Sequence, residues 1–230
     1  MTVTVTFVRH GESQDNPKGI WAGWKDAPLS DLAAAGKYFS TTKFDTIYAS
    51  PLLRANATAQ AIHGNQPEPF PSFIVNPNLR EQHFGRGEGH SFNVIFPKDV
   101  TLEELFAKKH EKFPEGESLN DLAARAEQAV KECVLPPLHK EEDVHIAMVS
   151  HGLCISELVA ALLRLDPDSP QDVDYKGLVN TGWTRVTVST KNNTAFSEEV
   201  PLSVQVTHVN ISDHLKDIVL FYFFLIPNPR

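Results

Sequence analysis

Short runs of β-branched and aromatic residues alternate along the chain with longer segments in which apolar residues recur at helical spacing. The apolar runs occupy residues 3–8, 46–49 and 144–149, and they predict buried strands. Helices are predicted over residues 31–39, 51–62, 118–133 and 154–165. This order of strand, loop and helix is typical of a doubly wound α/β domain, so we expect a mostly parallel sheet with helices on both faces.

Two of the predicted helices have clear start signals. Ser50 is placed as the N-cap of the second helix, and Pro51 as its first helical residue, because both residue types favour these positions. Ser118 opens the third helix, ahead of apolar residues at helical spacing.

The middle and the C-terminal part of the chain depart from the alternating pattern. Residues 64–117 are rich in Pro, Asn, Gly and Phe and show weak periodicity apart from a helical stretch near 102–112, which is typical of a substrate loop or lid. Residues 184–189 and 202–209 alternate with period two and predict a hairpin at the sheet edge. No linker or internal repeat divides the chain, so we interpret residues 1–230 as a single domain.

The composition is that of an acidic globular protein. With 21 Lys and Arg against 29 Asp and Glu, the formal net charge is −8, which argues against a surface for nucleic acid or anionic membranes. Cys133 and Cys154 form no C-x-x-C motif, so neither a zinc site nor a disulfide framework is indicated. The N-terminus has no basic region followed by an apolar stretch, and we expect a cytoplasmic protein.

One apolar stretch near the C-terminus has no role in this picture. Residues 218–226 read I-V-L-F-Y-F-F-L-I, which is far shorter than the roughly 20 residues that a membrane helix needs. We therefore expect no membrane partner. We interpret the stretch either as a terminal strand covered by the domain or as a contact in a homodimer.

Two of the predicted strands end in a His-Gly pair. His10 follows the first strand and is preceded by Arg9, while His151 follows the last of the three strands. Arg54 lies in the first turn of the helix after the remaining strand. Because the carboxyl ends of parallel strands meet at one edge of a sheet, these side chains can converge there. Guanidinium groups clamp two phosphate oxygens at once, so the arrangement suits a phosphoryl group.

Six sequence blocks occur in one order between the first strand and residue 188. They read R-H-G-E-S with Asn16 downstream, A-G-W-K-D-A-P-L-S, F-D-T-I-Y-A-S-P-L-L-R-A, L-R-E-Q-H-F-G, P-E-G-E-S-L and V-S-H-G. In content and order they resemble the phosphoglycerate mutase-like branch of the histidine phosphatase superfamily. The resemblance implies that His10 is a nucleophile that becomes phosphohistidine. It also implies that the phosphoryl group is held by Arg9, Arg54 and His151. The proton donor that it implies is Glu81.

The resemblance extends to further residues of the site. Asn16 and Gly23 match positions that line the phosphate pocket. Glu88 is an alternative to Glu81 as the proton donor, because it lies nearby in a Gly-rich stretch. Arg86, in the same stretch, either meets a second phosphate or a substrate carboxylate or is a solvated loop residue.

The activity that the resemblance implies is hydrolysis of a phosphate ester. The stretch E-Q-H-F-G-R-G-E-G resembles the fructose-2,6-bisphosphatase-like and broad-specificity phosphatases, and residues 89–116 are shorter than the Arg- and Tyr-rich insertion of the mutases. The chain contains no H-E-x-x-H, P-loop or metal-spaced acidic cluster, so no metal or cofactor is expected. We predict a metal-independent phosphomonoesterase for small phosphorylated metabolites. A phosphoglycerate mutase and a catalytically inactive scaffold that binds a phosphorylated ligand are the alternatives.

Overall fold

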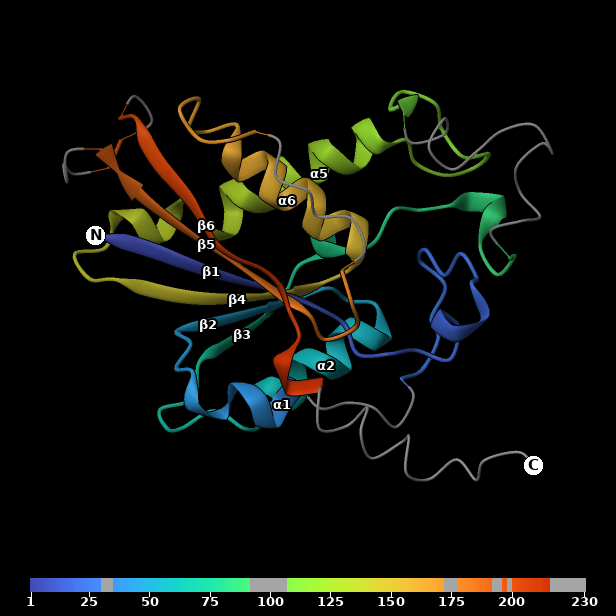
Figure 1. The fold of residues 1–230 in the computed structure, drawn as a ribbon, viewed down its shortest axis with the longest axis horizontal. Helices are drawn as coiled ribbons and strands as arrows, with labels where there is room; N and C mark the ends of the chain where they lie inside the picture. The colour runs from blue at the N-terminus through green and yellow to red at the C-terminus, as the bar shows by residue number, and fades with distance from the viewer. Residues whose placement is uncertain (30–34, 92–106, 172–177, 192–195, 198–199, 216–230) are drawn as a thin grey trace.

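The computed structural model describes residues 1–29, 35–91, 107–171, 178–191, 196–197 and 200–215. Its strands form one six-stranded sheet in the order β3-β2-β4-β1-β5-β6 (Figure 1). They are β1 (Thr2–Arg9), β2 (Thr46–Ala49), β3 (Ser72–Val75), β4 (Val144–Ser150), β5 (Trp183–Thr190) and β6 (Leu202–Ile211). The first four run parallel to one another, whereas β5 pairs antiparallel with both β1 and β6. The predicted mostly parallel sheet with an edge hairpin is confirmed.

Helices cover both faces of the sheet, as expected for a doubly wound domain. They are α1 (Ala35–Tyr38), α2 (Leu53–His63), α5 (Leu119–Cys133) and α6 (Gly152–Leu163). Helices α5 and α6 lie on one face, and α1 and α2 lie on the other (Figure 1). Val5 and Phe7 of β1 belong to the hydrophobic cluster under α5 and α6, whereas Val8 belongs to the cluster over α2. Both faces of the central strands are therefore buried, which explains their continuous apolar sequences.

Single-turn 3₁₀ helices connect these elements. They occupy Asn16–Lys18, Phe39–Thr41, Pro77–Leu79, Gly85–Gly87, Pro136–His139 and Asp213–Leu215. Three of them begin at or next to a proline, whose fixed φ suits the first helical position. The segments at 16–18 and 85–87 lie in loops that approach the carboxyl edge of the sheet, where the candidate site forms.

Helix α5 begins where the sequence predicts it. The Ser118 hydroxyl accepts a hydrogen bond from the Asp121 N–H (3.1 Å), and the Asp121 carboxylate accepts one from the Ser118 N–H (2.9 Å). The backbone N–H of Ser118, with help from Lys112, lowers the pKa of Asp121 to about 2. This reciprocal cap fixes the start of a helix whose contacts with the candidate site are described below.

Helix α2 begins later than predicted. Its first residue is Leu53, and the carboxylate of Asp26 accepts a hydrogen bond from the Leu53 N–H (2.7 Å). The prediction of Ser50 as N-cap and Pro51 as first helical residue is therefore wrong. The Ser50 hydroxyl lies 2.9 Å from Nε2 of His151, so a long-range partner competes with the local cap.

The middle of the chain contains a strand that the sequence did not predict. The edge strand β3 (Ser72–Val75) lies inside the stretch 64–117, whose sequence predicts a substrate loop or lid. Of the helix expected near 102–112, residues 108–112 form turn and irregular structure and residues 102–106 lie outside the described residues. The apolar stretch 218–226 lies outside them too. Among the residues that are described, no helix is long and apolar enough to cross a membrane.

His145 links the two central strands away from the candidate site. It lies near the start of β4, and its Nε2 is 2.8 Å from Oγ1 of Thr6 on β1. Burial, and next the positive charge of Arg185, lowers the pKa of His145 to about 4. In the unfolded chain an imidazole titrates near its ordinary pKa of about 6.5. Between these two values only the unfolded chain is protonated, so the free energy of unfolding falls as the pH falls from about 6.5 to about 4.

We expect His145→Gln to reduce the proton uptake on unfolding near pH 5 by about one proton. Urea unfolding of the wild type and the variant, from about pH 7 to about pH 4.5, measures this uptake as the slope of the unfolding free energy against pH. The variant should show the shallower slope. An unchanged slope would mean that His145 is protonated in the folded protein at these pH values.

Candidate active site

The candidate site forms where β1 and β4 end. These strands pair in parallel with Arg9 opposite Ser150, so the next residue of each, His10 and His151, emerges at the same edge of the sheet. The two ring centroids lie 5.1 Å apart, and both side chains are buried. The His10 N–H donates to the Ser150 carbonyl (3.0 Å), which extends the strand pairing by one residue. The strand register thus brings the two predicted histidines together.

The imidazole of His10 is held as a neutral base. Its Nδ1 lies 2.6 Å from the carbonyl oxygen of Gly11, and because a carbonyl can only accept, Nδ1 carries the ring proton. Nε2 therefore keeps its lone pair, and the Nε–H of Arg54 donates to it (3.3 Å). Burial, followed by the positive charges of Arg54 and Arg9, lowers the pKa of His10 well below its ordinary value. An unprotonated Nε2 is the atom that a nucleophilic histidine requires.

Arg54 reaches His10 from the first turn of α2 and is held by the loop before that helix. Its Nη2 donates to the carbonyl of Gly23 (2.8 Å), and its Nη1 donates to the carbonyl of Lys25 (3.1 Å). Gly23 has φ +50°, and a Cβ there would lie 2.2 Å from Oε1 of Glu88. Glycine is therefore required at this position. Through its carbonyl, Gly23 orients the guanidinium plane against His10.

Two buried donors of the site have no hydrogen-bond partner among the described residues. They are Nε of Arg9 and Nδ1 of His151. Because the Ser50 hydroxyl accepts from the Leu52 N–H (3.3 Å) and can donate its own proton to Nε2 of His151 (2.9 Å), we assign the ring proton of His151 to Nδ1. Buried donors without acceptors are costly, and an anion with several oxygens would satisfy both. The site is therefore built to receive an anionic group beside His10.

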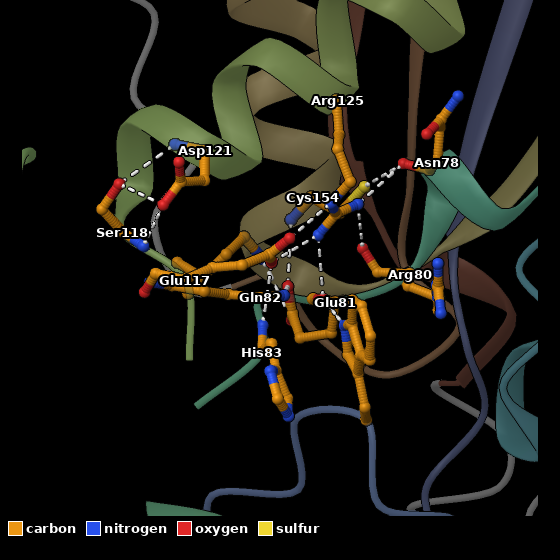
Figure 2. Close-up of polar contacts among 12 residues, drawn as sticks. Asn78, Arg80, Glu81, Gln82, His83, Glu117, Ser118, Asp121, Arg125 and Cys154 are labelled. Carbon is orange, nitrogen blue, oxygen red and sulfur yellow. Dashed lines mark hydrogen bonds and ion pairs between the residues drawn. The ribbon is translucent and has the colours of Figure 1, made fainter. Parts of the chain in front are cut away.

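The carboxylate of Glu81 lies at the N-terminus of α6, the helix that begins directly after His151. Its Oε1 accepts from the N–H groups of Gln82 (3.0 Å) and Cys154 (3.1 Å), and its Oε2 accepts from the N–H of Leu153 (3.3 Å) (Figure 2). A carboxylate has about four acceptor positions, so one on Oε2 remains open within the described part of the chain. Oε2 of Glu81, at the edge of the sheet where His10 lies, is therefore available for proton transfer.

Electrostatics also connect Glu81 with the cationic side of the site. Burial lowers the pKa of both Arg9 and Arg54, and the negative charge of Glu81 opposes this in each case. Glu81 is thus close enough to the two guanidinium groups to interact with both. Guanidinium groups remain cationic even when buried, so the site carries two positive charges and one negative charge around a neutral His10.

Glu88, the alternative proton donor, is engaged elsewhere. Its Oε1 accepts from the N–H groups of Trp24 (2.8 Å) and Phe84 (3.2 Å), and it lies 3.6 Å from Nε2 of His83. These contacts fasten two loops to each other. The geometry therefore favours Glu81 over Glu88 for proton transfer at His10.

The three residues predicted to bind substrate are placed differently. Oδ1 of Asn16 accepts from the N–H (2.8 Å) and hydroxyl (3.0 Å) of Ser13, close to the backbone of His10. Gly23 lies under Arg54, as described above. Arg86 is not brought to this cluster: its side chain is 73% exposed and its Nε donates to Glu115 (2.8 Å). A role of Arg86 in substrate binding stays a prediction.

Two further residues support the nucleophile and were missed in the sequence. Nδ2 of Asn180 donates to the His10 carbonyl (3.1 Å), and no periodicity or motif marks it. Oγ1 of Thr58 accepts from the Gly11 N–H (2.9 Å) and donates to the Arg54 carbonyl (2.7 Å). Thr58 lies four residues after Arg54 on the same helix face, and that spacing was the available signal.

A neutral buried imidazole flanked by two guanidinium groups, at the carboxyl edge of a doubly wound sheet, defines a class of enzyme that acts on phosphate esters. The family can be named more closely. Residues 5–197 match the model of the histidine phosphatase superfamily (branch 1), and the chain belongs to that superfamily. The resemblance found in the six sequence blocks is thereby confirmed.

Known proteins of this kind include both mutases and phosphatases. A 2,3-bisphosphoglycerate-dependent phosphoglycerate mutase from Bartonella henselae is 31% identical over 177 residues, which cover 73% of this chain and 85% of the relative. The structure of a mycobacterial glucosyl-3-phosphoglycerate phosphatase superimposes with a TM-score of 0.73 at 25% identity, covering 92% of this chain and 100% of that one. A mutant phosphoserine phosphatase from Entamoeba histolytica in complex with phosphoserine gives a TM-score of 0.65 at 26% identity, covering 93% and 99%. The fold and the phosphate-ester chemistry are shared across these proteins.

Proposed function

We propose that this protein is a metal-independent phosphomonoesterase that hydrolyses small phosphorylated metabolites through a phosphohistidine at His10. The observation that carries the proposal is the neutral His10 beside two buried donors without partners, Nε of Arg9 and Nδ1 of His151. A phosphoryl group has the oxygen acceptors that these donors lack. The solved structures of a glucosyl-3-phosphoglycerate phosphatase and a phosphoserine phosphatase support hydrolysis of small metabolites.

The first chemical step forms the phosphoenzyme. Nε2 of His10 attacks phosphorus in line with the ester oxygen, the N–P bond forms, and the P–O bond to the alcohol breaks. Glu81, which takes up a proton as the phosphate ester binds, donates it to the departing oxygen, so the product leaves as an alcohol. Arg9, Arg54 and His151 donate hydrogen bonds to the equatorial oxygens, and the Nε–H of Arg54 moves from Nε2 to one of them.

The second step returns the enzyme to its starting state. Glu81, now a carboxylate, takes a proton from water while the water oxygen attacks phosphorus. The N–P bond breaks, its electron pair returns to Nε2 of His10, and inorganic phosphate leaves. One ester and one water thus give one alcohol and one phosphate. No step requires a metal ion or an organic cofactor.

The location and the assembly of the protein are further parts of the proposal. We place the enzyme in the cytoplasm, because Cys133 and Cys154 are unpaired and buried, which suits a reducing compartment. Small phosphorylated metabolites are its expected substrates, and neither nucleic acid nor membrane is an expected partner of an acidic chain. A homodimer stays a prediction.

The mutase relatives favour one alternative activity. A phosphoenzyme can pass its phosphoryl group to a second substrate hydroxyl rather than to water, and a curated relative at 31% identity is a phosphoglycerate mutase. The two activities share the first step and differ in the acceptor. Release of inorganic phosphate indicates the phosphatase, and conversion of 3-phosphoglycerate to 2-phosphoglycerate without release indicates the mutase.

Phosphate release in the presence of a chelator tests the proposal. The panel contains phosphoserine, phosphoglycerates, fructose bisphosphates, nucleotides and p-nitrophenyl phosphate, each assayed with and without EDTA. We expect release from at least one alkyl phosphate, at an equal rate with and without EDTA, because His10 supplies the nucleophile and the side chains supply the positive charge. Loss of activity in EDTA, or no release from any compound by the folded protein, would contradict the proposal.

A further inference from the structure

The guanidinium of Arg125 on α5 directs three of its five N–H donors to main-chain carbonyls of the segment that carries Glu81. Its Nη1 donates to the carbonyls of Asn78 (3.0 Å) and Arg80 (3.2 Å), and its Nη2 donates to the carbonyl of Glu81 (3.1 Å) (Figure 2). Its two other donors, on Nε and Nη2, bind both carboxylate oxygens of Glu117 at 2.8 and 2.7 Å. One side chain thereby fixes three main-chain carbonyls, including that of Glu81.

Glu117 binds the two residues that follow Glu81 in the chain, Gln82 and His83. Its Oε2 accepts from the His83 N–H (3.0 Å), and its own N–H donates to the His83 carbonyl (2.8 Å). Its carbonyl accepts from the side-chain amide of Gln82 (2.9 Å). Residues 80–84 have no helix or strand of their own. The pair of Arg125 and Glu117 therefore provides the main-chain partners that a regular element would otherwise provide.

The pair is largely removed from solvent. Both side chains are 16% exposed. Burial alone would lower the pKa of Arg125, but the hydrogen bonds to Glu117 raise it overall, so the charge is held in place. A buried ion pair contributes little stability by itself, because desolvation offsets much of the attraction. The pair instead fixes the position of the backbone, because the three Arg125 donors that do not bind Glu117 bind three main-chain carbonyls.

We propose that Arg125, braced by Glu117, is a positioning residue that sets the Glu81 carboxyl group for proton transfer at the leaving oxygen. The inference rests on the proposed function, in which Glu81 protonates that oxygen. The α6 N–H groups of Leu153 and Cys154 hold the carboxylate, and Arg125 holds the main chain from which it projects. A catalytic group that is displaced by about 1 Å loses roughly 100-fold in rate.

Arg125→Lys tests the positioning role, because lysine keeps the charge but has fewer donors and no planar fork. Two substrates are compared: the best alkyl phosphate of the panel and p-nitrophenyl phosphate, whose phenolate leaves without a proton. Because Glu81 also acts in the second step, the rates compared are those of His10 phosphorylation in the first turnover. We expect this rate to fall about 10- to 100-fold for the alkyl phosphate and to change little for the aryl phosphate. Arg164→Lys is the control, because Arg164 forms an exposed ion pair with Glu127 on α5 and should leave both rates unchanged.

A double variant separates positioning of Glu81 from a general effect on the fold. In the Glu81→Gln background, Arg125→Lys should lower alkyl turnover no further, because the group that it positions is gone. Equal losses on both substrates, or a full additional loss in the double variant, would overturn the inference. If Arg125→Lys does not fold, Glu117→Gln is used, which keeps the shape but weakens the brace and should shift the alkyl-to-aryl ratio in the same direction.

The wild type and Glu81→Gln, measured in the same experiment, test the proposed function itself. Absence of phosphate release by the wild type, or an unchanged alkyl-to-aryl ratio in Glu81→Gln, would contradict the proposed function itself. An active wild type with a selective Glu81→Gln defect and a non-selective Arg125→Lys defect would contradict only the positioning role.

Discussion

His10→Asn is expected to lower kcat by about 10⁴-fold or more on every substrate, the aryl phosphate included. Asparagine is polar and small enough for the site, but its amide nitrogen has no lone pair that can attack phosphorus. A good leaving group cannot compensate, because the nucleophile is missing in the first step. Phosphate release, measured beside the unfolding temperature of the variant, gives the result.

The variant should remain folded, because the hydrogen bond from the His10 main chain to Ser150 does not involve the side chain. His208→Asn is the matched control, since His208 is an exposed imidazole on β6. Its turnover should equal that of the wild type. Retained activity in a folded His10→Asn protein would show that another group attacks phosphorus.

Arg54→Lys is expected to lower kcat/KM by about 10²- to 10³-fold, the effect of losing a transition-state donor. Lysine keeps a positive charge near His10, but a single ammonium group cannot reach Nε2 and the carbonyls of Gly23 and Lys25 together. The loss should therefore appear although the charge is conserved. The same losses on alkyl and aryl phosphates are expected, because both develop charge on the equatorial oxygens.

Stability should fall together with activity in this variant. Arg54 is 1% exposed, and each buried carbonyl that it leaves without a donor costs about 1–3 kcal/mol. Arg164→Lys controls for the chemical change at an exposed ion pair. A wild-type kcat/KM in folded Arg54→Lys would contradict the assigned clamp and would leave Arg9 and His151 as the groups that hold the phosphoryl oxygens.

The convergence of the site was predictable from the sequence because it depends on parallel strand register. β1 and β4 are adjacent, so the residues that follow their apolar runs, His10 and His151, must emerge together. Arg54 follows β2, which pairs with the other side of β4, and the same argument places it at this edge. The apolar runs alone therefore locate the phosphoryl-binding half of the site.

The proton-donor half could not be derived in this way. Glu81 lies in an irregular segment whose position depends on Arg125 and Glu117, about 40 residues later in the chain. Only the resemblance to known phosphatases pointed to it. Asn180 is a similar case, because its contact with the His10 carbonyl joins residues 170 positions apart. Long-range hydrogen bonds to irregular backbone leave no periodic signal in the sequence.

Two of the errors in the fold have physical reasons of the same kind. β3 (Ser72–Val75) is four residues long and lies between prolines, so its pattern is too short to distinguish from a loop. The cap of α2 was assigned to Ser50 on local preference, but the Ser50 hydroxyl contacts His151 and the carboxylate of Asp26 takes the cap position. Tertiary contacts overrode local propensity at the helix next to the site.

In the proposed mechanism the phosphoryl group is transferred to Nε2 of His10 before water attacks phosphorus. The most direct test mixes Glu81→Gln with an excess of p-nitrophenyl phosphate, because the aryl group leaves without an acid while the second step has lost its base. We expect a burst of about one nitrophenolate per chain, followed by slow steady-state release. Peptide mass spectrometry after an alkaline quench should find a phosphoryl group on His10. Turnover with no phosphoryl group on the protein, or a phosphoryl group on His151 instead, would contradict this mechanism.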